Sequence, residues 1–180
     1  DRYETIGKSV PRTHVKDKAT GAALYTDDIR LPGMLHGRLL RSPFAHARIL
    51  NIDTSRAEAL SGVKCVITGA DLPDIKFGNW RLFPDTQDEY ALARDKVRFI
   101  GDEVAAVAAT DRDTAEEALS LIKVDYEELP ASFDLDTSLA DGAPVIHYLH
   151  ENNISVVRKV THGDLDRAFE ESEYIREDIF

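Results

Sequence analysis

The feature that most constrains this fold is an apolar run at residues 104–109, followed by the pattern of an amphipathic helix. The run carries no polar side chain, which is typical of a strand that lies centrally in a sheet and is covered on both faces. Asp113 is then the expected N-cap of a helix, because apolar residues from Ala115 to Ile122 recur at the spacing i, i+3, i+4 and i+7. Together the two patterns predict a sheet with one helix packed on it.

Short strands bounded by turn residues are expected around this unit. They are residues 35–40, 47–52, 63–68, 96–100 and 124–128. A short helix is expected to begin at Ser55, because Ser55 and Glu58 form a capping-box pattern, and to end at Gly62. This succession of strands with few short helices predicts an α+β domain built on a mixed sheet.

Other segments are predicted to flank that domain. We expect a leader over residues 1–14, the domain over 15–131, a polar linker over 132–151 and the start of a second domain over 152–180. The first thirty residues as a whole are expected to be extended around a short strand.

The last of these segments has a pattern of its own. Residues 154–160 and 174–180 are strand-like, and Asp164 is placed to cap a short helix between them. Because an unpaired edge strand invites association, a natural chain seldom stops within a strand pattern. We therefore expect that the chain was cut from a longer protein.

Charge and composition argue against several classes of function. The chain has 22 Lys and Arg against 33 Asp and Glu, a net charge of -11, and an acidic protein without a basic cluster is a poor ligand for nucleic acid. No apolar stretch reaches the roughly 18 residues of a membrane span, and the first residues do not resemble a signal peptide, so a cytoplasmic protein is expected. The single cysteine, Cys65, excludes an internal disulfide, an iron–sulfur cluster and a cysteine-rich zinc site, and is expected to be a buried thiol.

Motif searches find no complete catalytic or phosphate-binding pattern. Neither the glycine-rich dinucleotide fingerprint nor the serine-hydrolase elbow occurs, and the G-K-S string at residues 7–9 lacks the earlier glycine of a phosphate-binding loop. His147 and His150 have a spacing that could bind zinc on a helix, but Pro144 favours a loop there. Surface histidines are therefore expected at these two positions.

A small acid–base enzyme is one alternative, using Asp102 or Glu103 with His36 or His46 near predicted strand ends. Against it, adjacent carboxylates in a tight turn point to opposite sides, so a solvated turn is the expected structure. Lone histidines beside strands more often satisfy backbone groups than transfer protons. We therefore expect no catalytic, cofactor-binding or metal-binding residue in this chain.

Several strings together resemble one known family. They are ATG (residues 19–21) with YTDD (25–28), LPGMLH (31–36), RSPFAHARI (41–49), DKVRFIGDEVAAV (95–107) and VDYEELP (124–130). The strings and the order of elements are similar to the N-terminal region of the large, molybdenum-binding subunit in the xanthine dehydrogenase and aldehyde oxidase family. Within that family the chain most resembles the catalytic subunits of 4-hydroxybenzoyl-CoA reductases.

The resemblance implies both a fold and a reaction. Residues from about 7 to 130 would form an α/β hammerhead domain, and residues 152–180, with His162-Gly163-Asp164, would open a molybdopterin-binding domain. The whole enzyme would hydroxylate or reductively dehydroxylate an aldehyde, an N-heterocycle or an aromatic acyl-CoA at a molybdenum–molybdopterin cofactor, with iron–sulfur and FAD groups in partner subunits. The family's cofactor-binding and active-site motifs match no position here, so they are expected downstream of Phe180, and the fragment alone should be inactive.

The role left for the chain is that of a scaffold, which covers the molybdenum domain and forms interfaces with the rest of its subunit and with partner subunits. The candidate interface residues are Arg41, Pro43, Phe44 and His46, in a turn between strands, and Trp80, in an irregular aromatic loop. The alternatives are that the arginines of the turn pair with nearby carboxylates and that the loop aromatics pack on the core. For the chain as a whole, the alternative is a free-standing acidic protein-interaction module.

Overall fold

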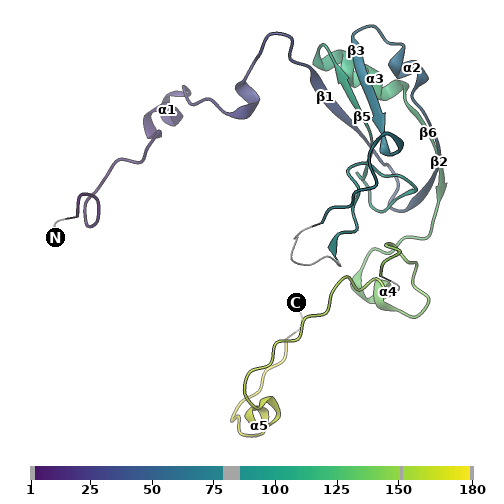
Figure 1. The fold of residues 1–180 in the computed structure, drawn as a ribbon. Helices are drawn as coiled ribbons and strands as arrows, with labels where there is room; N and C mark the ends of the chain where they lie inside the picture. The colour runs from purple at the N-terminus through teal and green to yellow at the C-terminus, as the bar shows by residue number, and fades with distance from the viewer. Residues whose placement is uncertain (1–2, 79–85, 151, 179–180) are drawn as a thin grey trace.

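The computed structural model describes residues 3–78, 86–150 and 152–178, and within them the strands form two three-stranded sheets (Figure 1). The first sheet is ordered β1 (His36–Arg41), β5 (Glu103–Ala109), β3 (Val63–Thr68), and the second is ordered β4 (Lys96–Val97), β2 (Ala47–Asp53), β6 (Lys123–Glu128). The α+β class is confirmed. Every strand pair is antiparallel, however, so two antiparallel sheets stand in place of the single mixed sheet that was expected.

The two sheets take their strands alternately from the chain. Strands β1, β3 and β5 enter the first sheet, and β2, β4 and β6 enter the second. In the first sheet, the pairing of β1 with β5 sets His36 opposite Ala109. Neither sheet is therefore built from a continuous stretch of sequence.

Strand β5 is central in its sheet, as its apolar sequence predicted. Helix α3 (Arg112–Leu121) follows it and packs back across one face, where Ala105 and Val107 contact Ala118 and Ile122 in a buried cluster (Figure 1). The opposite face of β5 is only partly buried. The covering that was expected on both faces is thus complete on one face alone.

Helix α3 has a different N-cap from the one that its sequence pattern suggested. Asp111, rather than Asp113, is the cap, because its Oδ1 accepts a hydrogen bond of 2.8 Å from the backbone N–H of Thr114. The Thr114 hydroxyl donates to the other oxygen of Asp111, and these bonds hold the pKa of Asp111 below its usual range. Asp113 lies in the first turn, where a carboxylate suits the positive end of the helix dipole.

Helix α2 (Ser55–Glu58) forms where the capping-box pattern placed it, but the cap itself differs. Thr54 is the N-cap residue, and its hydroxyl donates to the carboxylate of Glu58. Gly62 then turns the chain with φ at 96°, a conformation that glycine adopts without the steric cost of a side chain. A Cβ at Gly62 would lie 2.9 Å from the Thr110 hydroxyl, so glycine also permits close packing beside the start of α3.

The second sheet packs against β5 through a second buried cluster, which contains Ala47, Ala93, Val97 and Val104. Strand β4 is two residues long, shorter than the expected strand over 96–100.

The chain leaves this strand early because the Asp102 carboxylate accepts a hydrogen bond of 2.8 Å from the backbone N–H of Arg98. The following residues, Phe99 and Ile100, are exposed as a result. A short 3-10 turn, η2 (Gly69–Asp71), follows β3 where a turn was expected.

Cys65 is exposed, so the expectation of a buried thiol is wrong. Strand β3 lies at an edge of its sheet, and its register against β5 shifts between Val63 and Cys65. The shift pairs Cys65 with Ala108, on the face of the sheet away from α3. A one-residue shift of this kind decides which face a side chain occupies, and the apolar content of the strand does not reveal it.

Two arms extend from the sheets (Figure 1). The N-terminal arm contains α1 (Val15–Thr20) and the 3-10 turn η1 (Thr26–Asp28), and the C-terminal part contains α4 (Leu135–Leu139) and α5 (Leu165–Glu170). Asp164 caps α5 as predicted, by accepting a hydrogen bond from the backbone N–H of Arg167. Among the described residues, no helix has the length and apolar character needed to cross a bilayer.

The strands expected in the two arms are wrong. No strand forms among the described residues of 1–30, 154–160 or 174–180. An isolated segment gains no ladder hydrogen bonds without a partner strand, whatever its propensity. These segments are mostly exposed.

Candidate functional site

The predicted interface turn is only partly at the surface. Arg41 and Pro43 are exposed, but Phe44 is half-buried against Tyr126, with ring centroids 5.1 Å apart, and His46 is 4% exposed. His46 therefore cannot contact a partner at the surface of this chain. Trp80, the fifth candidate, lies outside the described residues.

The arginines of the turn pair with carboxylates, which was the alternative interpretation. Nη1 of Arg41 lies 2.7 Å from Oε1 of Glu103, and Arg48 forms an ion pair with Glu127 on the neighbouring strand β6. Each pair is partly exposed, so its contribution to stability is small. The pairs fix the direction of the two guanidinium groups and leave Pro43 as the projecting part of the turn.

A buried polar cluster lies beneath the turn, and its centre is Lys96. The lysine is 2% exposed, and its Nζ lies 2.9 Å from Nε2 of His46 and 3.0 Å from the backbone oxygen of Val145. The same ammonium lies over the ring of Tyr148, 4.3 Å from the centroid. A strand residue of the second sheet therefore holds the chain segment that follows α4.

Hydrogen bonding defines the protonation of His46. Its Nδ1 lies 2.6 Å from the backbone oxygen of Pro130, which can only accept, so Nδ1 carries the hydrogen and Nε2 accepts from Lys96. Burial lowers the pKa of His46, and the charge of Lys96 lowers it further. Burial likewise lowers the pKa of Lys96, with Arg98 as the next cause.

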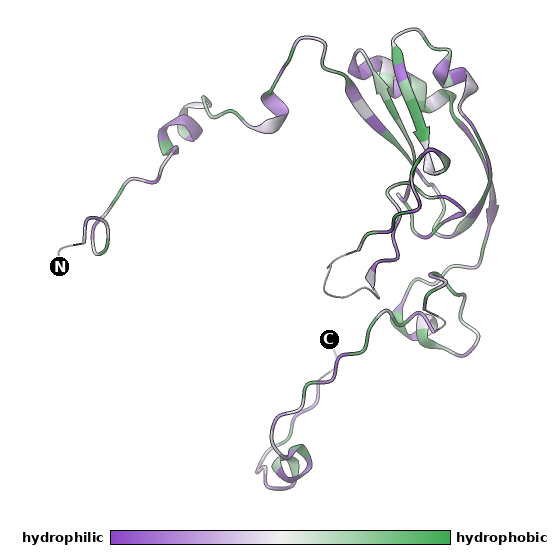
Figure 2. Ribbon diagram, in the orientation of Figure 1, coloured by the Kyte–Doolittle hydropathy of each residue, from purple (hydrophilic) through white to green (hydrophobic). Residues whose placement is uncertain are grey.

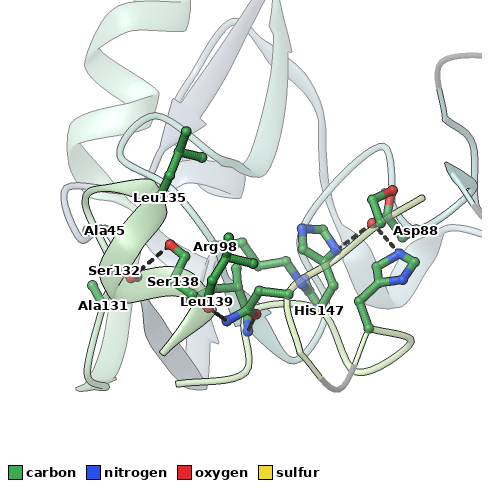
Figure 3. A pocket seen from close by; sticks show the side chains of 13 residues that line it. Ala45, Asp88, Arg98, Ala131, Ser132, Leu135, Ser138, Leu139 and His147 are labelled. Carbon is green, nitrogen blue, oxygen red and sulfur yellow. Dashed lines mark hydrogen bonds and ion pairs between the residues drawn. The ribbon is translucent and has the colours of Figure 1, made fainter. Parts of the chain in front are cut away.

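His147 and His150 converge on one carboxylate. Nδ1 of His147 lies 2.9 Å from Oδ2 of Asp88, and Nε2 of His150 lies 3.4 Å from the same oxygen. Figure 3 shows His147 beside Asp88. His150 has no hydrogen bond at Nε2, and its side chain is 9% exposed. The loop predicted for these residues is confirmed. The prediction of a surface histidine is wrong for His150, whereas His147 is partly exposed, at 28% of its side chain.

This histidine pair borders a cleft of about 380 Å³. Polar lining groups come from Arg98, Ser132, Ser138 and Asn153, and Leu135 and Leu139 of α4 supply apolar lining (Figure 3). Burial lowers the pKa of His147, partly offset by the nearby charge of Asp88. The residues that line the cleft come from positions 45, 88 and 98 and from the segment 131–155, so the cleft is a junction between two parts of the chain.

The four residues considered for an acid–base site do not come together into one site. His36 and Glu103 lie at opposite ends of the β1–β5 pairing, which places them about 17 Å apart at the rise of an antiparallel strand. His46 is occupied by Pro130 and Lys96. Asp102 is half-buried rather than solvated, and burial raises its pKa.

The described residues do not fit a metal-binding role. They contain no group of three or more His, Cys, Asp or Glu side chains with the arrangement that a metal ion requires. The one cysteine is exposed on a sheet face.

Comparison with known proteins identifies the family. The description "Aldehyde oxidase and xanthine dehydrogenase, a/b hammerhead domain" matches residues 20–130. The chain belongs to this family. The hammerhead domain of this description comprises both sheets, with α2 and α3.

Three similar proteins show how much of a relative the hammerhead chain represents. The nicotinate dehydrogenase large molybdopterin subunit of Eubacterium barkeri is 35% identical over 178 residues, which are 99% of this chain and 40% of that protein. The carbon monoxide dehydrogenase large chain of Afipia carboxidovorans is 42% identical over 151 residues, 81% of this chain and 18% of that one. The quinoline 2-oxidoreductase structure from Pseudomonas putida has a TM-score of 0.72 and 41% identity, and it covers 81% of this chain and 19% of its own. The chain thus spans less than half the length of these relatives.

Sequence reasoning missed the buried cluster. Lys96 lies in one of the strings that carry the family resemblance, yet a lysine in a strand is ordinarily read as solvent-facing. Asp88 and Tyr148 lie in irregular segments without periodicity. The one available signal was that Lys96 and Arg98 stand at alternate positions of the predicted strand, which places both on one face.

Proposed function

We propose that this chain is the hammerhead part of the large subunit of a molybdenum-dependent dehydrogenase or hydroxylase, and that it acts as a scaffold without an active site of its own. The match of the hammerhead domain to residues 20–130 carries the proposal. The names of the relatives support it, because the relative from Eubacterium barkeri is a large molybdopterin subunit and that from Afipia carboxidovorans is the large chain of a dehydrogenase.

The two arms support the scaffold role. Apolar side chains along them are exposed, which is unfavourable unless another surface covers them. These side chains are Leu24, Tyr25, Ile29 and Leu31 before β1, and Ile154, Val157, Val160, Phe169 and Tyr174 after the cleft. We take residues 15–131 as the hammerhead domain, 132–151 as the linker and 152–180 as the start of the molybdopterin-binding domain.

The buried cluster gives the scaffold a means of holding that linker. Lys96 contacts Val145 and Tyr148, so the segment that leads toward the second domain is fixed to the second sheet. The complete enzyme would carry a molybdenum–molybdopterin cofactor beyond this chain, exchange electrons with iron–sulfur and FAD subunits, and work in the cytoplasm. The substrate class remains an aldehyde, an N-heterocycle or an aromatic acyl-CoA.

Metal and pterin analysis tests this proposal. The large subunit, purified from its full gene together with the adjacent reading frames, is expected to contain stoichiometric molybdenum and pterin and to copurify with iron–sulfur and flavin proteins. The 180-residue chain is expected to contain neither and to show no turnover. Molybdenum bound by the 180-residue chain, or its absence from the complete subunit, would contradict the proposal.

A free-standing interaction module is the less favoured function. The relatives from three genera contain the same domain within much longer chains. An in-frame stop codon directly after Phe180 in the gene would be the finding that favours the module.

A further inference from the structure

The sheet β1-β5-β3 has a second face that α3 does not cover. Alternate residues of a strand point to opposite faces, and Leu40, Ala105, Val107 and Val66 pack toward α3. Their neighbours therefore point away from the helix. These outward residues are Gly37 and Leu39 of β1, Ala106 and Ala108 of β5, and Cys65 and Ile67 of β3.

The outward residues form two cross-strand rows. Gly37, Ala108 and Cys65 lie side by side in the strand register, and so do Leu39, Ala106 and Ile67. The six include no charged side chain, and Leu39 is 41% exposed. Figure 2 shows the hydrophobic colour along β3 and β5.

This composition differs from that of a face in contact with water. An antiparallel sheet with one solvated face alternates apolar and polar residues, whereas these six outward residues include no polar side chain other than the Cys65 thiol. Glycine and alanine at the centre leave the surface nearly flat, so a further layer can approach to the usual spacing of about 10 Å. The described residues of this chain leave Cys65 and Leu39 exposed.

We propose that this open face is the docking surface for another part of the same large subunit, which packs on it as a third layer. The inference rests on the proposed function. These two relatives are at least about two and a half times as long as this chain, since it covers 40% or less of them, so most of each relative's polypeptide lies outside the matched residues. A layer tethered to the same chain also has a high effective concentration.

A second copy of the chain fits this face less well. Each copy has a net charge of -11, so two copies repel one another on approach. Another part of the same polypeptide does not have to have this net charge, so the repulsion between two identical chains does not apply to it.

Cys65 is a built-in probe of this surface, because it is the single cysteine and lies within the face. A maleimide is expected to modify Cys65 rapidly in the 180-residue chain. In the isolated complete large subunit, modification is expected to be at least about tenfold slower, because a covered thiol reacts only through local opening. Mass spectrometry of the peptide that contains Cys65 measures both rates.

The matched control moves the thiol to the outer side of α3. In the double variant Cys65→Ser, Glu117→Cys, the new thiol is at an exposed position and should react at the same rate in both polypeptides. Equal reactivity of Cys65 in the two polypeptides would overturn the inference, and so would slow reaction in the 180-residue chain itself. Protection that appears only after separate subunits are added, or only at high concentration of the 180-residue chain, would assign the face to another occupant and would likewise overturn it.

The outcome is separable from that of the proposed function. If the large subunit contains molybdenum but Cys65 stays reactive, the proposed function is supported and the proposed docking surface is wrong. If the large subunit contains no molybdenum, the proposed function is wrong, whatever the reactivity of Cys65.

Discussion

Lys96 brings a cation into the interior, where the groups that hold it are neutral. An imidazole nitrogen, a backbone carbonyl and a phenol ring contact its ammonium. Burying a charge is costly unless hydrogen bonds replace its hydration. Lys96 therefore depends on His46 and on the segment around Val145, and that segment depends on Lys96.

Replacement of Lys96 by alanine is expected to lower the free energy of unfolding by about 2–4 kcal/mol, since it leaves a cavity and removes the donor to His46 and Val145. Urea unfolding followed by circular dichroism measures the change. Lys123→Ala is the control, because Lys123 is exposed at the start of β6, and its loss should change stability by less than about 0.5 kcal/mol. Equal effects of the two variants would show that Lys96 is not held as described.

The buried histidines predict how stability depends on pH. The pKa values of His46 and His147 lie below the ordinary 6.5, mainly because of burial. Below pH 6.5 the unfolded chain therefore binds protons that the folded chain does not, and stability falls as the pH drops through the lowered values. Asp102 acts in the opposite direction, because its raised pKa makes stability fall as the pH rises above 3.8 toward that value.

The free energy of unfolding is expected to decrease between about pH 7 and about pH 5, and His147→Gln should make this decrease smaller. Urea titrations at several pH values measure the slope. His162→Gln, in the exposed C-terminal arm, is the control and should leave the slope unchanged. A slope that His147→Gln does not alter would contradict the assignment.

At the scale of elements, most strands were predictable because each has an apolar or alternating pattern with turn residues at both ends. The prediction for β3 matches its bounds, and those for β1, β2, β5 and β6 are within one residue at each end. The predictions that were wrong depend on tertiary contacts. Strand β4 ends before its predicted end because the Asp102 side chain accepts a hydrogen bond from the backbone N–H of Arg98. The arms form no strand in their described parts because a strand requires a partner.

The N-cap of α3 offers a direct comparison of the sequence-based expectation with the structure. Asp111→Ala is expected to lower the melting temperature by about 2–4 °C, because it removes the acceptor for the Thr114 N–H. Asp113→Ala is the matched variant and should have the smaller effect, since Asp113 contributes only through the helix dipole. Calorimetry measures the melting temperatures of both variants. A larger decrease for Asp113→Ala than for Asp111→Ala would show that Asp113 is the cap.

For the whole molecule, the family could be predicted from the sequence, but the buried cluster could not. The family resemblance depends on contiguous strings, which a sequence displays directly. The cluster joins His46, Lys96 and Tyr148 across three separate segments. Such a convergence depends on the path of the chain after β6, and no local pattern specifies that path.

The contrast between the sheets and the arms predicts how the chain is digested. Trypsin is expected to cut first at exposed basic residues of the arms, such as Lys16, Lys18 and Lys159, because cleavage requires an accessible, locally unfolded backbone. Resistant fragments in which Lys96 and Arg98 are uncut should remain. Mass spectrometry of a time course identifies the fragments, and early cleavage after Lys96 would contradict the rigid core.

The alternation of strands between the two sheets has a consequence for synthesis of the protein. Strand β5 lies between β1 and β3 but follows both along the chain, so a ribosome releases both edge strands before the strand that joins them. Until residue 109 has emerged, the first sheet has no pairing available to it, and its apolar strands are open to misassociation. The nascent chain therefore has a long vulnerable interval, during which chaperones that bind exposed strands would be expected to act on it.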